Sequence, residues 1–358
     1  MSTIQVQNIN STDGSTAITT GADGYVSFAK TQIGGRRNLI INGAMQVAQR
    51  GTSFAGATTA YHTDRWVDVM NLGSWTISQS SDAPDGFGYS HKWDCTTANG
   101  TLAAGSELIF VTRLEGQDCQ QLKYGSANAE SLTLSFWVKS SKTGTYTVEF
   151  DQYGDRQISR TYTIDSANTW EYKTVTVAGD TGGSIDNDNS AEFQLLFWLG
   201  AGSNLTSGTL NTSAWATTTN ANRVSSSNVN LADNTANDWY ITGVQLEVGP
   251  LATPFEHRSY GEELALCQRY YEVSNSTFAN CMWNGYAASG TAQYGTGIFK
   301  VTKRTTPTVI LTNQSAQLFP TSPSPQAIDI DGFYDGRIAN GTGQTGFFSS
   351  TFTASAEL

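Results

Sequence analysis

The sequence predicts an all-β fold: a jelly-roll β-sandwich body, preceded by short N-terminal strands and followed by one connecting helix and a small C-terminal β domain. Apolar residues alternate with period two in many segments, and clusters of Gly, Asp and Ser separate these segments at near-regular intervals. This pattern is typical of antiparallel sandwiches, and only one segment carries a helical period. With 358 residues, the chain is long enough for two or three folded units.

Residues 1–36 predict an attachment segment rather than a domain. Short apolar runs around Ile9 and Ile18 are interrupted by the turn pairs Asp13-Gly14 and Asp23-Gly24. Strands this short bury no core of their own. We therefore expect them to pair with other chains or to dock on a larger body.

Residues 37–256 predict the sandwich body. Residues 38–43 are typical of a buried strand that ends in a turn, and residues 192–199 are almost uniformly apolar, as in a central strand. The clearest alternating segments are residues 132–138, 145–150, 160–164, 170–177 and 239–248. Residues 202–237 are rich in Ser, Thr, Asn and Ala, and they predict a long loop with three apolar anchors: Leu210, Trp215 and Val229.

Residues 257–272 predict the connecting helix. Ser259 is suited to cap its N-terminus, and Glu262 and Glu263 fall in the first turn, where the helix dipole favours carboxylates. One stripe of this helix carries three residues at spacings i, i+3 and i+7, namely Leu264, Cys267 and Tyr271.

Residues 273–358 return to β patterning. Strands are expected at residues 295–301, 307–311 and 345–352, and three prolines at 320, 323 and 325 mark an irregular loop. A unit of this size has a small core, so we expect oligomerisation to stabilise it.

The composition excludes some classes of partner. Charged residues make up 14% of the chain, against about 25% in ordinary soluble domains, and the net charge is −11. Nucleic acid needs clustered cations, and the densest clusters here, Arg36-Arg37 and Lys303-Arg304, are typical of solvated turns. The sequence shows no signal peptide and no apolar run near 18 residues, so we expect a cytosolically made protein without membrane insertion.

No motif indicates a cofactor, a metal or a catalytic centre. The four cysteines, Cys95, Cys119, Cys267 and Cys281, show no C-x-x-C spacing, and they could pair as 95/119 and 267/281 or remain free thiols. Two of the three histidines, His62 and His91, have no ligand spacing, and His257 suggests a structural corner before the helix. The sequence contains no H-E-x-x-H, no G-x-S-x-G and no phosphate loop.

Six motifs in order resemble tail-fibre and other virion structural proteins of tailed bacteriophages, whose central region is similar to carbohydrate-binding-module jelly rolls. The motifs are NLIINGAMQVAQRG (38–51), DRW (64–66), TLSFWVK (133–139), ITGVQLEVGP (241–250), TPFEHR (253–258) and GEELALCQRYY (261–271). The resemblance covers residues 37–272 and, more weakly, both ends. It implies a fibre or spike subunit on a virion, with residues 1–36 bound to other tail or capsid proteins.

The resemblance also implies a homo-oligomer, with a trimer as the expected form. Leu264, Cys267 and Tyr271 would then contact neighbouring subunits. Folding in the reducing host cytosol favours free thiols over disulfides. Carbohydrate modules often hold a structural calcium between carboxylates of the first and last strands. This chain has Ala44-Met45-Gln46 and Thr242-Gly243 at those places, so we expect no calcium there.

Adhesion to a bacterial surface glycan is the expected function, because aromatic rings stack on sugars. Most tryptophans, including Trp137, Trp198 and Trp239, lie in strong strands and predict packing in the core or between subunits, although Trp137 has the parity opposite to its apolar neighbours. The better surface candidates lie in the polar loop and near the tip: Trp215, Trp283 and Tyr286.

Two other functions remain open. The chain could be a purely structural virion part, such as a capsid fibre, a decoration protein or a tail adaptor. It could also be a glycan depolymerase, which would need two carboxylates roughly 5–10 Å apart in a groove. Asp151 with Asp155, or the set Asp329, Asp331 and Asp335, could supply them. Nothing else in the sequence resembles a depolymerase, and we predict a protein that is not an enzyme.

Overall fold

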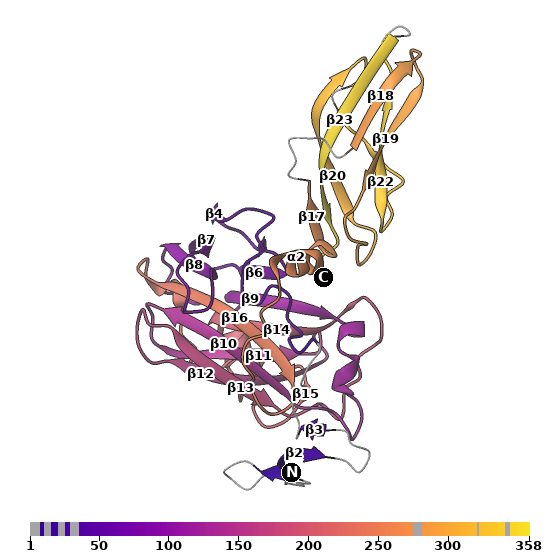
Figure 1. The fold of residues 1–358 in the computed structure, drawn as a ribbon. Coiled ribbons are helices and arrows are strands. Elements are labelled where there is room, and N and C mark those ends of the chain that lie inside the picture. Colours follow the sequence, from indigo (N-terminus) through magenta and orange to yellow (C-terminus); the bar gives the residue numbers. More distant parts are fainter. Residues whose placement is uncertain are drawn as a thin grey trace.

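A computed structural model describes residues 8–10, 16–20, 26–28, 36–274, 281–320, 322–340 and 344–358 of the chain. It shows a β-sandwich body and an elongated C-terminal domain, called the tip here, joined at helix α2 (Tyr260–Gln268) (Figure 1). Both parts are built from antiparallel sheets, which confirms the all-β fold expected from the period-two patterning.

Two sheets form the body. The six-stranded sheet has the order β13 (Glu171–Val177), β10 (Leu132–Ser140), β16 (Asp238–Val248), β8 (Ser90–Thr97), β7 (Ser74–Ser80) and β4 (Ser53–Ala55). The seven-stranded sheet has the order β15 (Ala216–Thr217), β12 (Arg156–Ile164), β11 (Gly144–Asp151), β14 (Ala191–Ala201), β9 (Glu107–Glu115), β6 (Trp66–Met70) and β5 (Ala60–Thr63). The 3₁₀ turns η1 (Gly116–Asp118) and η2 (Gln120–Leu122) follow β9.

The core lies between the two sheets, and strand parity decides which side chains enter it. On β10, Leu134, Phe136 and Val138 have no exposed surface. Trp137 alternates with them and lies on the outer face of the six-stranded sheet, where it lines a surface cavity. Of the two alternatives predicted for Trp137, packing in the core is therefore wrong, and packing between subunits stays a prediction. Trp198 and Trp239 are fully buried.

Residues 38–43 do not form a regular strand, contrary to the prediction. The segment is held to β16 by Leu39 N donating to Leu246 O (3.0 Å) and by the side chain of Asn38. Asn38 Oδ1 accepts hydrogen bonds from the backbone N–H groups of Ile40 and Leu246, both at 3.0 Å. The side-chain amide of Asn38 therefore replaces the backbone–backbone hydrogen bonds of a regular strand pair, and the segment is buried without forming a strand.

Residues 202–237 cover the outer face of the seven-stranded sheet. The excursion contains α1 (Ser203–Thr206), strand β15, and the 3₁₀ turns η3 (Asn220–Asn222) and η4 (Leu231–Asp233). Leu205 and Val224 pack against the outward-facing Trp198 and form a second hydrophobic cluster with it. Both faces of β14 are therefore buried over residues 195–201, which explains why this part of the strand is apolar.

The connecting helix is shorter than predicted. Ser259 caps α2, since its Oγ accepts a hydrogen bond from Glu262 N (3.3 Å), and the helix ends at Gln268. Tyr271 therefore does not share the helical stripe with Leu264 and Cys267, but begins a strand of the tip.

The tip is a smaller sandwich of two sheets. In one, β23 (Gln344–Ser355) pairs on one side with β17 (Tyr271–Val273) and β18 (Cys281–Ala287), and on the other with β20 (Thr308–Gln317). The second has the order β19 (Ala292–Ile298), β22 (Gly332–Ile338) and β21 (Pro325–Gln326). At the other end of the chain, β1 (Asn8–Asn10), β2 (Thr16–Thr20) and β3 (Val26–Phe28) pair with one another as a small antiparallel sheet.

The last residues of the tip return to the body and are held there by arginines. Arg65 and Arg50 form ion pairs with Glu357, and Arg113 and the Tyr61 hydroxyl donate to the carbonyl oxygen of Leu358. Two rings of the connecting segment cover these cations: Arg65 lies 3.4 Å from the centroid of Tyr270, and Arg50 lies 3.6 Å from that of Tyr271. We call residues 356–358 with these arginines the tail clamp.

Cys95, Cys119 and Cys267 are buried free thiols, which is one of the two arrangements that the sequence left open. The side chain of Cys281 lies outside the described part of the chain. Within the described residues, no helix has both the length and the apolar character needed to cross a membrane.

Candidate functional site

The predicted aromatic candidates occupy different environments. Trp215 is 7% exposed, packs against Tyr124 and Phe193, and donates from Nε1 to Ala178 O (2.7 Å). A ring enclosed in this way has no free face to stack on a sugar, so the surface role predicted for Trp215 is not compatible with its position. The polar residues around Trp215 suggested an exposed loop, but residues 202–237 pack against the body instead of projecting into solvent.

The two candidates on the tip differ in exposure. Trp283 is half-buried between Phe319 (5.2 Å between ring centroids) and Phe348 (6.1 Å). Tyr286 is 70% exposed. Of the two, Tyr286 therefore presents the larger free ring surface, and its glycan role stays a prediction.

The residues predicted to contact other subunits lie at the joint between body and tip. Cys267 has no exposed surface, so its side chain packs within this chain, while Leu264 and Tyr271 remain partly exposed. Their role in an oligomer interface stays a prediction.

A cavity of about 390 Å³ opens on the outer face of the six-stranded sheet, and we call it the sheet cavity. Trp137 from β10 and Tyr172 from the neighbouring β13 are cross-strand partners, with ring centroids 5.3 Å apart. Tyr172 is 45% exposed, so this pair offers an aromatic surface to solvent. The remaining lining residues are Asp85, Gly86, Phe87, Ser135, Gly243, Pro254, Phe255 and His257.

A second cavity, of about 460 Å³, adjoins the first, and we call it the helix cavity. The two share a wall of three rings, because Phe87, Phe255 and His257 have mutual centroid distances of 4.9 to 5.3 Å and line both. Tyr89 and Tyr260, 42% and 56% exposed, lie at its rim. Together, the sheet cavity and the helix cavity form what we call the aromatic groove.

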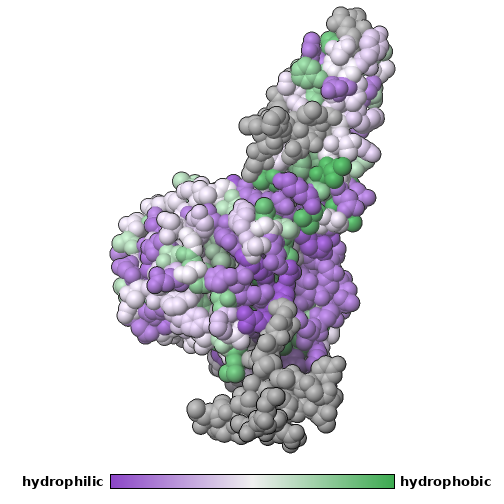
Figure 2. Space-filling model, viewed as in Figure 1, coloured by the Kyte–Doolittle hydropathy of each residue, from purple (hydrophilic) through white to green (hydrophobic). Residues whose placement is uncertain are grey.

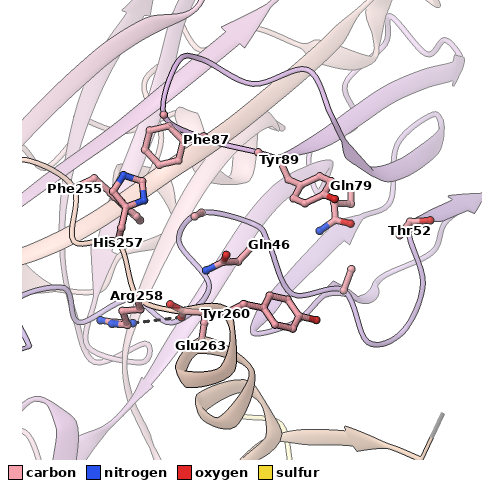
Figure 3. A pocket seen from close by; sticks show the side chains of 14 residues that line it. Gln46, Thr52, Gln79, Phe87, Tyr89, Phe255, His257, Arg258, Tyr260 and Glu263 are labelled. Atoms are coloured by element: carbon pink, nitrogen blue, oxygen red, sulfur yellow. Dashed lines mark hydrogen bonds and ion pairs between the residues drawn. The ribbon is translucent and has the colours of Figure 1, made fainter. Parts of the chain in front are cut away.

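Uncharged polar groups line much of the helix cavity. Figure 3 shows Gln46 in the middle of the view, with Phe87 and His257 on one side of it and Tyr260 on the other. The amide of Gln46 makes no hydrogen bond within the described residues, whereas Gln79 is oriented by donating from Nε2 to Met45 O (2.7 Å). An amide in this position can donate to and accept from hydroxyl groups of a ligand.

The charged side chains of the helix cavity are largely satisfied within the protein. Arg258 forms an ion pair with Glu263 (3.3 Å), and it also donates to Ile40 O (3.1 Å). Glu263 in turn accepts a hydrogen bond from Asn42 N. The groups left for a ligand are aromatic faces, amides and hydroxyls, with the exposed carboxylate of Asp85 at the sheet cavity.

Beyond the groove, the same outer sheet face carries a lysine, Lys139, that packs against aromatic rings and pairs with a carboxylate. Lys139 lies 4.2 Å from the ring centroid of Tyr240 and forms an ion pair with Asp82. Trp170 Nε1 donates a second hydrogen bond to Asp82 (3.1 Å). The hydrogen bond from Lys139 is the main cause that lowers the pKa of Asp82, so this carboxylate stays ionised and paired.

One buried polar network was not predicted from the sequence. Asp68 has no exposed surface, and its two oxygens bind His91 Nε2 (2.7 Å) and His62 Nδ1 (2.9 Å). The hydroxyl of Thr63 meets His91 Nδ1 (2.8 Å). Burial alone would raise the pKa of Asp68, but the interactions with His91 and His62 lower it overall. The network ties β5 and β6 of the seven-stranded sheet to β8 of the six-stranded sheet, so it links the two body sheets.

Among the carboxylates proposed for a depolymerase, Asp151 and Asp335 are buried and accept hydrogen bonds within the protein. Asp151 has no exposed surface and accepts from Gln194 Nε2 (2.9 Å) and Gly154 N, while Asp155 lies on the exposed turn beside it. Asp335 is fully buried in an ion pair with Arg337 (2.8 Å). The described residues contain no group of three or more His, Cys, Asp or Glu side chains placed to hold a metal.

Sequence reasoning missed most of the aromatic groove. Phe87, Tyr89 and Gln46 lie in loops without a repeating pattern, so no periodicity pointed to them. A signal existed for Trp137, because its parity is opposite to that of Leu134 and Phe136. A prediction that residues 132–138 and 171–177 pair as antiparallel strands would also have placed Tyr172 beside Trp137.

Comparisons with known proteins give distant structural likenesses only. No family model and no curated protein matches the chain. The chain is similar to the enzymatically active domain of tailspike protein 4 from bacteriophage CBA120, at 14% identity and a TM-score of 0.31, over 59% of this chain and 21% of that one.

Two similar structures are carbohydrate-binding modules. TmCBM61, solved in complex with β-1,4-galactotriose, is 9% identical over 60% of this chain and 99% of that one, with a TM-score of 0.30. The CBM22-1 xylan-binding domain from Paenibacillus barcinonensis Xyn10C is 10% identical over 56% of this chain and 94% of that one, with a TM-score of 0.26. At these scores, no ligand or site is transferred from these proteins to this chain.

Proposed function

We propose that this chain is a subunit of a phage tail fibre or spike that adheres to a neutral glycan of the host surface through the aromatic groove. The observation that carries the proposal is the Trp137–Tyr172 pair at the sheet cavity, in which Tyr172 is 45% exposed, beside amides and hydroxyls of the groove. Sugar rings present CH faces to aromatic side chains and hydroxyls to amides. An acidic glycan is disfavoured by the net charge of −11.

The fibre role is supported by the six motifs of residues 37–272, which follow one another in the order seen in phage tail-fibre proteins. The small N-terminal sheet would attach to the virion. Adhesion without catalysis fits the internal ion pairs of Glu263 with Arg258 and of Asp335 with Arg337. A single shallow sugar site binds near millimolar, about 4 kcal/mol. In a homo-oligomer, several sites engage together and avidity rises by about 10² to 10⁴.

Binding of the purified protein to host cells and to their extracted polysaccharide tests this proposal. We expect Trp137→Ala and Tyr172→Ala to weaken retention in polysaccharide affinity gels by roughly tenfold, because each removes a stacking ring worth about 1–2 kcal/mol. Tyr286→Ala is the matched control, since it removes an exposed ring on the tip.

The outcomes separate the rival functions. A loss with Tyr286→Ala and none with Trp137→Ala would place the glycan on the tip and contradict a site in the aromatic groove. A wild-type protein that binds virions but neither cells nor polysaccharide would be a purely structural virion part. Release of reducing ends from the polysaccharide would contradict adhesion without catalysis.

A further inference from the structure

The strands of the tip present no charge to solvent. In β18 to β23 the only charged residues are Asp335 and Arg337, and both are fully buried against each other. In the view of Figure 2, the tip is mostly pale, of intermediate hydropathy, while strongly hydrophilic residues gather on the body. Edge strands and open sheet faces of soluble monomers usually carry lysine or other charges that prevent association. The described tip strands lack this protection.

Four large side chains project from the outer face of the β19–β22–β21 sheet, and we call them the tip ridge. Their exposed fractions are 73% for Ile298, 59% for Ile338, 51% for Tyr294 and 45% for Tyr334. Isolated exposed apolar residues are ordinary, but four on one face of a small sheet form a patch.

The strand register gives this ridge a regular shape. The four outward-facing pairs of the β19–β22 ladder each join one large residue and one small residue: Ile338 with Ala292, Tyr294 with Gly336, Tyr334 with Thr296, and Ile298 with Gly332. The large side chains therefore alternate between the two strands and stand above small neighbours. The amide of Gln326, from β21, lies over Gly336 and adds an uncharged polar group beside the ridge.

We infer that the tip ridge is the surface through which copies of this chain associate, ridge against ridge. An uncharged face lets two chains of net charge −11 meet without bringing like charges together. Alternating large and small positions allow the side chains of one ridge to fill the low positions of the other. Exposed isoleucines have no flat face for a sugar ring, so a second copy suits this surface better than a glycan does. The inference is independent of glycan binding in the aromatic groove.

Light scattering on the full chain tests the assembly. We expect a mass at least twice the 38.5 kDa of one chain, and a single-chain mass for the double variant Ile298→Lys with Ile338→Lys. Ile310→Lys is the matched control, because Ile310 is 63% exposed on β20, in the other sheet of the tip, and its variant should keep the wild-type mass. Circular dichroism confirms that each variant remains folded.

Cysteine cross-linking gives a second readout that does not depend on a destabilising charge. Thr296→Cys places a thiol on the ridge and should give a covalent dimer on mild oxidation, while Thr312→Cys on β20 should not. A monomeric wild type, or a ridge variant with unchanged mass and no Thr296→Cys dimer, overturns the inference. Dissociation by Leu264→Asp with no effect of the ridge variants would assign assembly to helix α2 instead. If the wild type is monomeric and Tyr334→Ala abolishes polysaccharide binding, the ridge is a glycan surface.

Discussion

Gly243 decides the shape of the sheet cavity through its backbone. Its φ is +62°, and the β10–β16 register shifts beside it, between Ser135 and Trp137. A Cβ atom at this position would lie 2.7 Å from Phe87 Cζ and 3.2 Å from Trp137 Cδ1. Only glycine therefore allows these two rings to approach the strand so closely.

We predict that Gly243→Ala weakens polysaccharide binding by about tenfold and lowers the free energy of unfolding by about 1–3 kcal/mol. Affinity gels and urea unfolding measure the two effects. Gly154→Ala is the control, since Gly154 also has positive φ (+91°) but open space around it. It should lose some stability and no affinity, and equal affinity for both variants would contradict the role of Gly243.

The buried Asp68 network makes the stability depend on pH. Because the pKa of Asp68 is lowered below its ordinary value of 3.8, its stabilising effect is fully present above that value and is lost as the pH falls through the folded-state pKa. Asp68→Asn should cost about 2–4 kcal/mol near neutral pH, because an amide cannot accept from both histidines.

Urea unfolding at about pH 7 and about pH 3 should show the Asp68→Asn deficit shrinking in acid. The control is Asp94→Asn, which removes a partly exposed partner of Lys92 and should change stability by less than about 1 kcal/mol at both pH values. A deficit that does not change with pH would show that Asp68 is not the titrating group.

At the scale of elements, the excursion of residues 202–237 is part of the folded core. Trp215 of this excursion packs in the main core between the two body sheets. Leu205 and Val224 pack on the outer face of the seven-stranded sheet, against Trp198. We predict that Trp215→Ala lowers the free energy of unfolding by about 3–5 kcal/mol, as expected for a large buried ring. Tyr172→Ala, which removes an exposed ring, should cost less than about 1 kcal/mol in the same denaturation experiment.

Sequence patterning predicted the elements whose side chains alternate between core and surface. The strands at 132–138, 145–150 and 239–248 appear as β10, β11 and β16 with small changes in their ends. The pattern failed where side chains replace backbone pairing, as at Asn38, and where a polar segment is buried through one aromatic anchor, as at Trp215. The groove was hidden because long-range register, rather than local sequence, brings its residues together.

For the whole molecule, the tail clamp holds the tip to the body. Arg65 is almost fully buried, and its charge is balanced by Glu357. Burial opposes the charged form of Arg65, but the adjacent Glu357 carboxylate raises its pKa overall, so the guanidinium remains charged. Removing Glu357 would leave an uncompensated buried cation.

We predict that Glu357→Gln lowers the free energy of unfolding by about 2–4 kcal/mol and broadens the distribution of body–tip distances seen by small-angle X-ray scattering. Glu262→Gln is the matched control, since it breaks an ion pair with Arg36 whose side chains are about half exposed, and it should cost less than about 1 kcal/mol. Equal effects of the two substitutions would contradict a structural role for the clamp.

The central place of β23 has a consequence for biosynthesis. All its sheet partners, β17, β18 and β20, precede it in the chain, and residues 356–358 then complete the clamp. A ribosome therefore delivers the middle of this sheet after its flanks. Until β23 emerges, the earlier strands of the tip have unpaired edges, whereas all strands of the two body sheets have already been synthesised. Nascent chains would be most prone to aggregate in that interval, and chaperone dependence should fall once the final strand is released.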